Sequence, residues 1–377
     1  MIVTYHNSGA TLGPWLPTMI DIGTLKVYSP GNQAREWGLG WDQIVDLATA
    51  MQQPFRVAVL PVYYNRKTEF SYLPQYDDID IRQFDLVCWT DIEFRSQHEL
   101  IDWIEQQGGS QWLLMVAGIQ HHEPLRERVI YRPAWAMNFL EWNQDRSDFP
   151  MARPFLFDCL CGTRRQHRDY VMLSMLDSGL LERSIVTYRD VFVGGDCTHT
   201  PDYVQAQFPH LEVPWPYVSP NLDPSWEVPG KIDRSISGLV PWEIYNRTWF
   251  SILVETLGYG ETFLAAEKVG KCLHARRLFV HFGAAYYLEN LRSLGFETFD
   301  SVLDESYDRM FKDNVRRWRM AFDQVKWLSQ QDPAKLLTKV KPILDHNHDR
   351  LQRLVKAKRD EMHRLIAHYL NEVSQYR

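Results

Sequence analysis

The sequence has no long hydrophobic run and few cysteines. Its longest apolar stretches, such as residues 113–117, fall far short of the roughly 18 residues that a membrane-spanning helix needs. The first residues lead straight into a strand-like run without a basic and then apolar leader, so we expect no secretory signal. The five cysteines are odd in number and scattered. They therefore form no disulfide framework, and they favour a reducing, cytoplasmic compartment with no membrane partner.

What is present is the composition of a folded protein. Of the 377 residues, 45% are hydrophobic and 24% are charged, which excludes a disordered chain. A chain of this length is too long for one ordinary core and predicts two domains of roughly 150–190 residues. No internal repeat or low-complexity tract interrupts it.

Charge is distributed unevenly along the chain. Residues 309–377 contain 16 Lys and Arg against 8 Asp and Glu, a net charge of +8, whereas the whole chain carries −7. The rest of the chain is therefore at −15. A basic end on an acidic body is one mark of a nucleic-acid or other anionic partner, and the alternative is a solvated helical face.

Buried strands alternate with amphipathic helices over the first 145 residues. We expect strands at 2–5, 25–28, 55–63, 84–89 and 112–117 and helices at 41–52 and 100–107. The pattern restarts with strands at 154–160, 184–188, 249–254 and 278–282 and helices through 171–176, 267–274 and 285–294. Residues 201–230 are predicted to be a long irregular connection, and everything after Asp304 to be helix, interrupted near Asp332-Pro333 and Pro342.

This alternation predicts an α/β protein whose parallel sheets are covered on both faces. We expect an N-terminal Rossmann-like domain over residues 1–150, a second over 151–308, and a basic helical tail over 309–377 that packs back across both. Ligands of such sheets bind at the carboxyl ends of the strands. Two halves of this kind facing a cleft would form the GT-B plan of many nucleotide-sugar glycosyltransferases, although a fold alone does not establish a function.

The segment from Glu255 to Phe299 is the most informative part of the sequence. Glu267 and Lys268 open a predicted helix directly after a loop, and Lys271 follows one turn later. A helix N-terminus with lysines is a ready phosphate site, and a neighbouring carboxylate can accept both hydroxyls of a ribose. The alternative is an ordinary amphipathic helix with an exposed Glu-Lys pair.

Over residues 154–347 the sequence resembles a group of GT-B glycosyltransferase-like proteins common in cyanobacteria and tailed phages. The Glu-Lys pair is also similar to the donor-binding segment of α1,3-fucosyltransferases. The matching positions are Gly162, Arg165, His167-Arg168, Glu255-Thr256, Phe263, Glu267-Lys268, Lys271, Gly283, Tyr287-Leu288, Leu291-Arg292, Leu294-Gly295-Phe296, Thr298-Phe299, Asp304-Glu305-Ser306-Tyr307-Asp308 and His346-Asn347. The sequence departs from the pattern at Ala266 and Val269, where the family has threonine, and at residues 274–277.

The resemblance implies a nucleotide-sugar donor, a UDP-sugar, bound by the C-terminal half. Arg165, Arg168, Glu255, Glu267, Lys268 and Lys271 are the expected donor-binding residues. Arginine forks suit diphosphate oxygens, so we interpret Arg165 and Arg168 as diphosphate clamps, with surface salt bridges as the alternative. No cofactor is expected.

A metal-independent enzyme is the preferred interpretation, because basic groups and helix N-termini can carry the leaving diphosphate. Asp78-x-Asp80 is the one triplet that would hold a metal in other glycosyltransferases, but it lies in a polar, exposed-looking stretch. Cys159-x-Cys161 has no partner pair for zinc. We therefore expect no metal site.

A general base must take the proton of the acceptor hydroxyl, and it should lie at a strand end of the N-terminal half. Asp91, after the predicted strand 84–89, ranks first, because a carboxylate is the commonest base for inversion at a sugar carbon. His121, next to His122, and His6 follow. Each has a structural alternative, such as helix capping by Asp91.

The acceptor molecule is inferred from the family resemblance and from the charge of the C-terminal residues. The phage-like resemblance and the basic tail favour a hydroxylated pyrimidine in double-stranded phage DNA, glucosylated or arabinosylated in the cytoplasm of an infected bacterium. Arg316, Arg317 and Arg319 are the expected DNA contacts. The alternatives are a surface glycan or small hydroxyl compound as acceptor, and an inactive binding module of the same fold.

Overall fold

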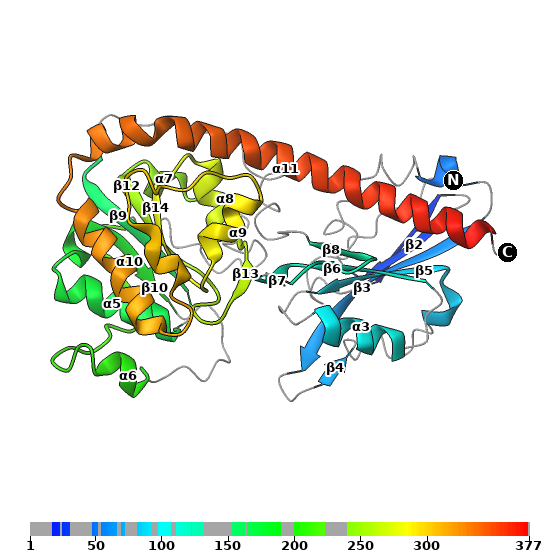
Figure 1. The fold of residues 1–377 in the computed structure, drawn as a ribbon, viewed down its shortest axis with the longest axis horizontal. Coiled ribbons are helices and arrows are strands. Elements are labelled where there is room, and N and C mark those ends of the chain that lie inside the picture. Colours follow the sequence, from blue (N-terminus) through cyan, green and yellow to red (C-terminus); the bar gives the residue numbers. More distant parts are fainter. Residues whose placement is uncertain are drawn as a thin grey trace. The chain divides into compact units, whose positions relative to one another are not determined.

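The computed structural model describes most of the chain, namely residues 17–22, 25–30, 47–51, 54–65, 69–71, 81–91, 97–106, 111–121, 123–131, 153–162, 164–189, 200–222 and 240–375. Within these residues the protein has a mixed α/β fold with parallel sheets, as the alternating pattern predicts (Figure 1). The chain divides into two compact units, residues 1–134 with 353–377 and residues 135–352. No helix in the described part is both long and apolar enough to cross a membrane.

The first unit contains a sheet with strand order β1-β2-β3-β5-β6-β8, with β4 paired to β3. All neighbours from β2 to β8 along this path are parallel, and β1 and β4 pair antiparallel. The strands are β1 (Pro17–Ile22), β2 (Leu25–Pro30), β3 (Phe55–Asn65), β4 (Glu69–Ser71), β5 (Leu86–Asp91), β6 (Trp112–Val116) and β8 (Val129–Tyr131). A short strand β7 (Gly118–Gln120), the helix α3 (Gln97–Gln106) and a turn η2 (Ile81–Gln83) complete the described elements.

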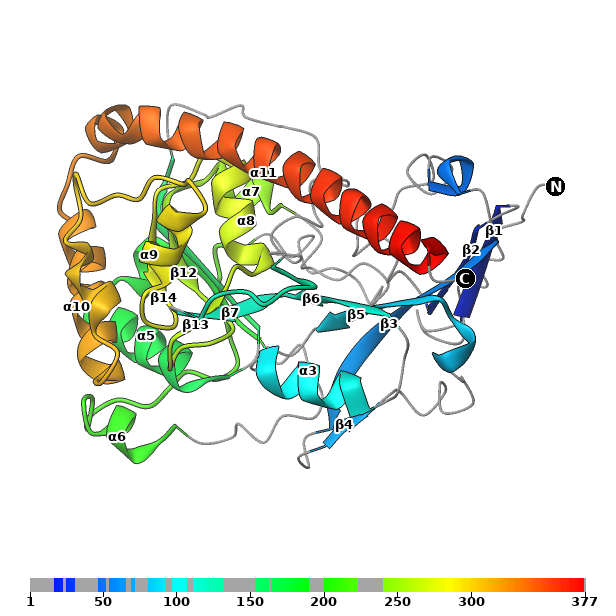
Figure 2. The same ribbon diagram turned by 45° about the vertical axis from the view of Figure 1, so that its right-hand side comes forward.

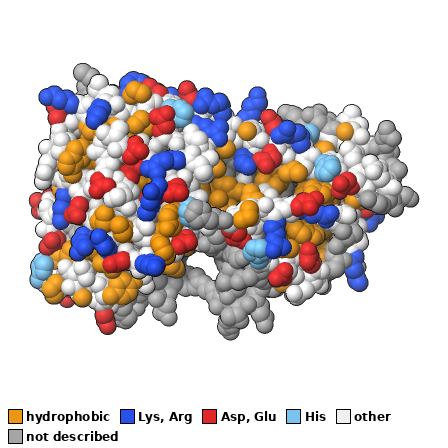
Figure 3. Space-filling model, in the orientation of Figure 1, with side chains coloured by type: hydrophobic (Ala, Val, Ile, Leu, Met, Phe, Trp, Pro, Cys, Tyr) orange, Lys and Arg blue, Asp and Glu red, His pale blue; other side chains and the backbone are white. Residues whose placement is uncertain are grey.

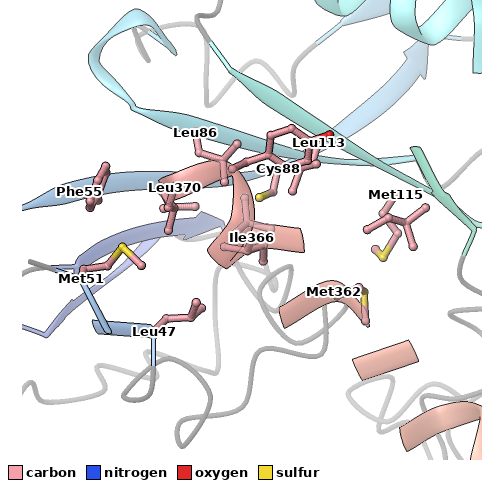
Figure 4. Packing of buried hydrophobic residues seen from close by; sticks show 14 of the residues in the cluster. Leu47, Met51, Phe55, Leu86, Cys88, Leu113, Met115, Met362, Ile366 and Leu370 are labelled. Atoms are coloured by element: carbon pink, nitrogen blue, oxygen red, sulfur yellow. The ribbon is translucent and has the colours of Figure 1, made fainter. Parts of the chain in front are cut away.

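Both faces of this sheet are covered, which explains why its strands read as continuous apolar runs. On one face Leu86 and Cys88 join a cluster that includes Met362 and Ile366 from the last helix (Figure 4). The alternate residue Trp89 is 1% exposed, and its ring lies 5.3 Å from that of Trp103 in α3. Successive side chains of a strand point to opposite faces. β5 therefore packs against the last helix on one face of the sheet and against α3 on the other.

The second unit contains a sheet with strand order β11-β10-β9-β12-β14. β10, β9, β12 and β14 are parallel, and β11 is antiparallel at the edge. The strands are β9 (Phe155–Cys161), β10 (Ser184–Tyr188), β11 (Tyr217–Val218), β12 (Thr248–Val254) and β14 (Phe279–Phe282), with a separate short strand β13 (Thr262–Leu264). The helices are α5 (Gln166–Asp177), α6 (Asp202–Gln205), α7 (Trp242–Tyr245), α8 (Glu267–His274), α9 (Tyr287–Ser293) and α10 (Asn314–Leu328), with 3-10 turns η4 (Leu181–Arg183) and η7 (Glu305–Arg309).

The connections of this sheet run outward in two directions from its centre. The chain goes from β9 through α5 to β10 on one side, and from β12 through α8 to β14 on the other. Because crossovers between parallel strands are right-handed, α5 and α8 must lie on opposite faces of the sheet. They do, with α5 and α10 on one side and α8 and α9 on the other (Figures 1 and 2).

The last helix, α11 (Pro333–Gln375), belongs to both units by packing. The predicted interruption at Pro342 is wrong, because the helix continues through it. Pro342 is exposed, so the carbonyl group that loses its partner faces water and can be solvated. The predicted interruption near Asp332-Pro333 is confirmed, because α10 ends at Leu328 and α11 begins at Pro333. The prediction of α-helix directly after Asp304 is wrong, because residues 305–309 form a 3-10 turn and α10 begins only at Asn314.

Candidate functional site

The order of strands in the second unit creates a topological switch point between β9 and β12. The connection that leaves β9 turns away from the one that leaves β12, so a crevice is expected at their carboxyl ends, where open α/β sheets bind ligands. β9 ends at Cys161, and β12 ends at Val254, directly before Glu255. Arg165 lies between β9 and α5, Arg168 lies in the first turn of α5, and Glu255 follows β12.

The loop after β9 is fixed by an arginine that is not available for a ligand. Arg164 is 7% exposed and forms an ion pair of 3.0 Å with Asp169 in the first turn of α5. It also donates to Thr200, and its guanidinium lies over the ring of Trp215. Arg164 is therefore held in a buried ion pair within the second unit. Arg165, the next residue, is only partly buried and stands at the N-cap of α5.

Two side chains from α5 tie this loop to the end of β12. His167 Nε2 lies 2.8 Å from the carbonyl oxygen of Glu255, and Arg168 Nη2 donates to the same oxygen at 3.2 Å. Burial, followed by the charges of Arg168, Arg165 and Lys268, lowers the pKa of His167 well below its usual range. The imidazole is therefore neutral, and the residues on both sides of the switch point form one connected cluster.

Glu255 is 1% exposed, and its carboxyl group has a defined setting. Tyr287 donates its hydroxyl hydrogen to Oε1 at 2.9 Å, and the N–H group of Thr256 donates to Oε2 at 3.3 Å. Burial raises the pKa of Glu255 from 4.5 to about 7, although the charge of Lys268 acts to lower it. Near pH 7 the protonated and the ionised form of this carboxyl group are therefore both populated.

Helix α8 supplies the second group of charges. Lys268 Nζ lies 3.1 Å from Glu267 Oε1, and both side chains are 19% exposed. Burial acts to raise the pKa of Glu267, but the charges of Lys268 and Lys271 outweigh it and the pKa is lowered. Burial lowers the pKa of Lys271 to about 8. Neither N-cap residue, Ala266 of α8 or Arg165 of α5, makes a side-chain capping bond.

This arrangement has the chemistry of an anion site with carboxylates at its edge. Two helix N-termini and four basic residues can bind the oxygens of a diphosphate. The carboxylate groups can accept hydrogen bonds from sugar or ribose hydroxyls. All six predicted donor-binding residues lie in the second unit around this point: Arg165, Arg168, Glu255, Glu267, Lys268 and Lys271.

The three candidate bases belong to the first unit. Asp91 is the last residue of β5, and His121 follows β7, both in the first unit. The side chain of Asp91 and all of His6 lie outside the described residues, as do Asp78 and Asp80. The role of general base therefore stays a prediction for each of them.

The predicted DNA contacts divide into two kinds. Arg316 and Arg319 are exposed on α10. Arg317 is 2% exposed and donates to the carbonyl oxygens of Met310, Gly258 and Gly283 at 2.6, 2.8 and 3.2 Å. The prediction of a DNA contact does not hold for Arg317, because its guanidinium is buried and bonded within the protein.

Several residues of the family-like motif have structural roles. Asp308 accepts hydrogen bonds from the N–H groups of Leu288 and Glu289 and thereby caps α9. Asn347 exchanges two hydrogen bonds of 2.8 Å with the backbone of Glu297. These residues hold the loops on either side of α9 in place, which fixes the position of Tyr287 at the start of that helix.

Sequence reasoning assigned no role to Tyr287 or His281. The two rings stack with centroids 3.7 Å apart, and the Tyr287 hydroxyl reaches Glu255. A side chain at Gly283 would lie 2.4 Å from the His281 ring and 3.3 Å from Glu255 Cβ, so glycine is needed there. The signals in the sequence were a histidine inside an apolar strand and the place of Tyr287 in the family-like motif, and neither of them specifies a role.

No group of His, Cys, Asp and Glu suited to a metal ion occurs among the described residues. Cys159 and Cys161 are buried with their sulfur atoms 3.9 Å apart. Two thiols without further ligands do not make a zinc site.

Comparisons with known proteins give one likeness. No protein-family model and no curated protein sequence matches the chain. Among solved structures, the chain is similar to one described as T4 phage BGT in complex with UDP and Mn2+. The sequence identity is 12% and the TM-score 0.38, over 84% of this chain and 83% of that chain.

Proposed function

We propose that this protein is a glycosyltransferase that transfers a sugar from a nucleotide-sugar, a UDP-sugar, to a hydroxyl group. The observation that supports it is the clustering of four basic residues, two carboxyl groups and two helix N-termini at one topological switch point. A diphosphate bridged to two sugars is the ligand class that needs all three kinds of group together. The GT-B fold, in which two Rossmann-like halves face a cleft, is part of this proposal.

In the proposed reaction the donor-site residues stabilise the leaving diphosphate. Arg165, Arg168, Lys268 and Lys271 would offset the negative charge that develops when the sugar–phosphate bond breaks. Glu267 would accept the ribose hydroxyls. Because the basic side chains carry this charge, activity is proposed to need no metal ion, and it should survive EDTA. Loss of activity with EDTA and recovery with Mn²⁺ would favour the Asp78-x-Asp80 alternative.

Asp91 is proposed as the general base, followed by His121 and His6. Its place at the end of a parallel strand supports this. Asp91→Asn should lower kcat by about 10²–10⁴-fold while the affinity for the donor stays unchanged. His121→Asn serves as the matched comparison, and an unchanged kcat in Asp91→Asn would remove Asp91 from the role.

The proposed acceptor is a hydroxylated pyrimidine base in double-stranded DNA, supported by the exposed Arg316 and Arg319 and by the basic tail. A surface glycan or small hydroxyl compound is the second candidate. One observation favours it, namely that several tail lysines are paired with tail carboxylates, such as Lys341 with Asp345 and Lys358 with Glu361.

The deciding experiment is a transfer assay. The protein is incubated with a panel of nucleotide sugars and with normal or hydroxymethylated DNA, and the mass gain of the DNA is measured. Glu267→Ala should abolish donor binding in calorimetry, with Glu243→Ala on the exposed face of α7 as control. Donor binding without any transfer to any acceptor would favour the inactive binding module.

A further inference from the structure

The carboxyl group of Glu255 is contacted or influenced from every element that surrounds it. From α9, Tyr287 donates to Oε1, and from its own loop Thr256 donates to Oε2. From α8, Lys268 favours the charged form of the carboxyl group and Glu267 opposes it. This balance makes Lys268 the principal electrostatic support of the ionised carboxylate.

The remaining neighbours are neutral or act on the backbone. From β14, His281 stacks on the Tyr287 ring, and burial lowers its pKa well below the usual range. From α5, His167 and Arg168 bind the carbonyl oxygen of Glu255. Neither histidine therefore competes for a proton with Glu255 near neutral pH.

A bound diphosphate would disturb this balance in one direction. The phosphate oxygens would attract Lys268, which would then stabilise the ionised Glu255 less. The negative charge of the diphosphate would also repel a carboxylate buried beside it. Both effects favour the neutral acid, which can also donate a hydrogen bond to a phosphate oxygen. The proton comes from solvent, and no other bond forms or breaks.

We propose that Glu255 takes up a proton when the diphosphate of a nucleotide sugar binds at this switch point, and that Tyr287 is the positioning residue that holds the carboxyl group for this step. The inference rests on the proposed donor site and adds its coupling to pH. Because Glu255 has a pKa of about 7, the affinity for the donor should fall as pH rises above 7, by at most about tenfold per pH unit.

The test is calorimetry of UDP-glucose binding at pH 7.5 in buffers of different ionisation enthalpy, which gives the number of protons taken up. UDP-glucose is suitable because its phosphates are diesters and lack the ionisation near pH 6 of a phosphate monoester. The wild-type protein should take up about half a proton or more. Glu255→Gln should still bind UDP-glucose and lose most of this uptake.

Tyr287→Phe separates positioning from a purely structural role. Without the hydroxyl donor the pKa of Glu255 rises further, so the group is already protonated at pH 7.5 and the uptake moves to higher pH. Tyr245→Phe is the matched control, since Tyr245 is a buried tyrosine whose hydroxyl lies near Cys272 instead. Lys271, whose pKa is about 8, is the other group that could take up a proton. Uptake by Lys271 would persist in Glu255→Gln, and this distinguishes it from uptake by Glu255.

Two results would overturn the inference. Binding of UDP-glucose without proton uptake, or with uptake unchanged in Glu255→Gln, would refute the proton coupling and leave the donor site standing. Absence of UDP-glucose binding by the wild-type protein would refute the proposed donor site and the inference together.

Discussion

At the scale of single residues, the second unit contains a carboxyl group whose burial has a measurable cost. Glu255 is 1% exposed, and burial raises its pKa from 4.5 to about 7. Below pH 4.5 the folded and unfolded states both hold the proton. Between pH 4.5 and 7 the unfolded chain releases it while the folded protein keeps it, so stability falls as pH rises. Above pH 7 the loss is complete.

This predicts the behaviour of Glu255→Gln, which removes the titration. Between pH 4 and 8 the wild-type free energy of unfolding should decrease relative to the variant by about 3 kcal/mol. Urea unfolding at a series of pH values measures it. Glu243→Gln, at an exposed glutamate of the same unit, should follow the wild-type curve. Parallel curves for wild type and Glu255→Gln would contradict the raised pKa.

Arg317 offers a second prediction at this scale. Arg317→Ala removes the guanidinium that donates to three carbonyl oxygens, although the oxygen of Gly258 keeps Trp318 as a donor, and it should lower the free energy of unfolding by on the order of 3 kcal/mol. Arg316→Ala, at the exposed neighbour, should change it by less than about 0.5 kcal/mol. Thermal unfolding of both variants checks this. Equal effects would mean that the burial of Arg317 has no energetic weight.

At the scale of elements, α11 stabilises both units by different means. Near its start Asn347 and Arg350 bind the backbone of the loop that follows α9. Its last turns place Met362, Ile366 and Leu370 in the core of the first unit. The first half of the helix therefore combines these hydrogen bonds with buried apolar side chains such as Val340 and Leu344, whereas the contacts of the last turns are apolar.

Met362→Ala should therefore destabilise the first unit. Met362 is fully buried, and truncation of such a side chain costs about 2–5 kcal/mol. Hydrogen exchange should show reduced protection of the β3 and β5 amides and unchanged protection of β9 and β12. Arg364→Ala, on the exposed side of the same helix, is the control. A uniform loss of protection in both sheets would contradict an effect confined to the first unit.

The strands could be predicted from the sequence where both of their faces are buried. β5, β6, β9 and β12 read as apolar runs because both of their faces are covered, and the predicted helix 267–274 coincides with α8. The proposed donor residues were predicted through the Glu-Lys pair and its motif. Arg317 was misassigned because a buried and an exposed arginine look the same in sequence. Tyr287 was missed because its partner is 32 residues away and meets it only in the fold.

At the scale of the whole molecule, the uneven charge along the sequence can be compared with the surface that carries it. The net charge of +8 over residues 309–377 suggests a basic surface, but on the face drawn in Figure 3 the described acidic and basic side chains are interspersed. Pairs within the tail, such as Lys341 with Asp345, offset part of its positive charge. The exposed Arg316 and Arg319 are the residues on α10 that remain as candidates for phosphate contacts.

The last prediction separates the two acceptors. If DNA is the acceptor, binding to duplex DNA should weaken as salt rises, and the double variant Arg316→Glu, Arg319→Glu should reduce the steepness of that dependence by about 2. The loss should be similar for all DNA sequences, since phosphate contacts position the protein without specifying bases. Arg183→Glu, at an exposed arginine outside residues 309–377, is the control. Undetectable DNA binding at about 50 mM salt would contradict a DNA acceptor. The basic residues would then serve to offset the acidic body, and the hydroxyl group that receives the sugar would have to be sought on a glycan or a small molecule.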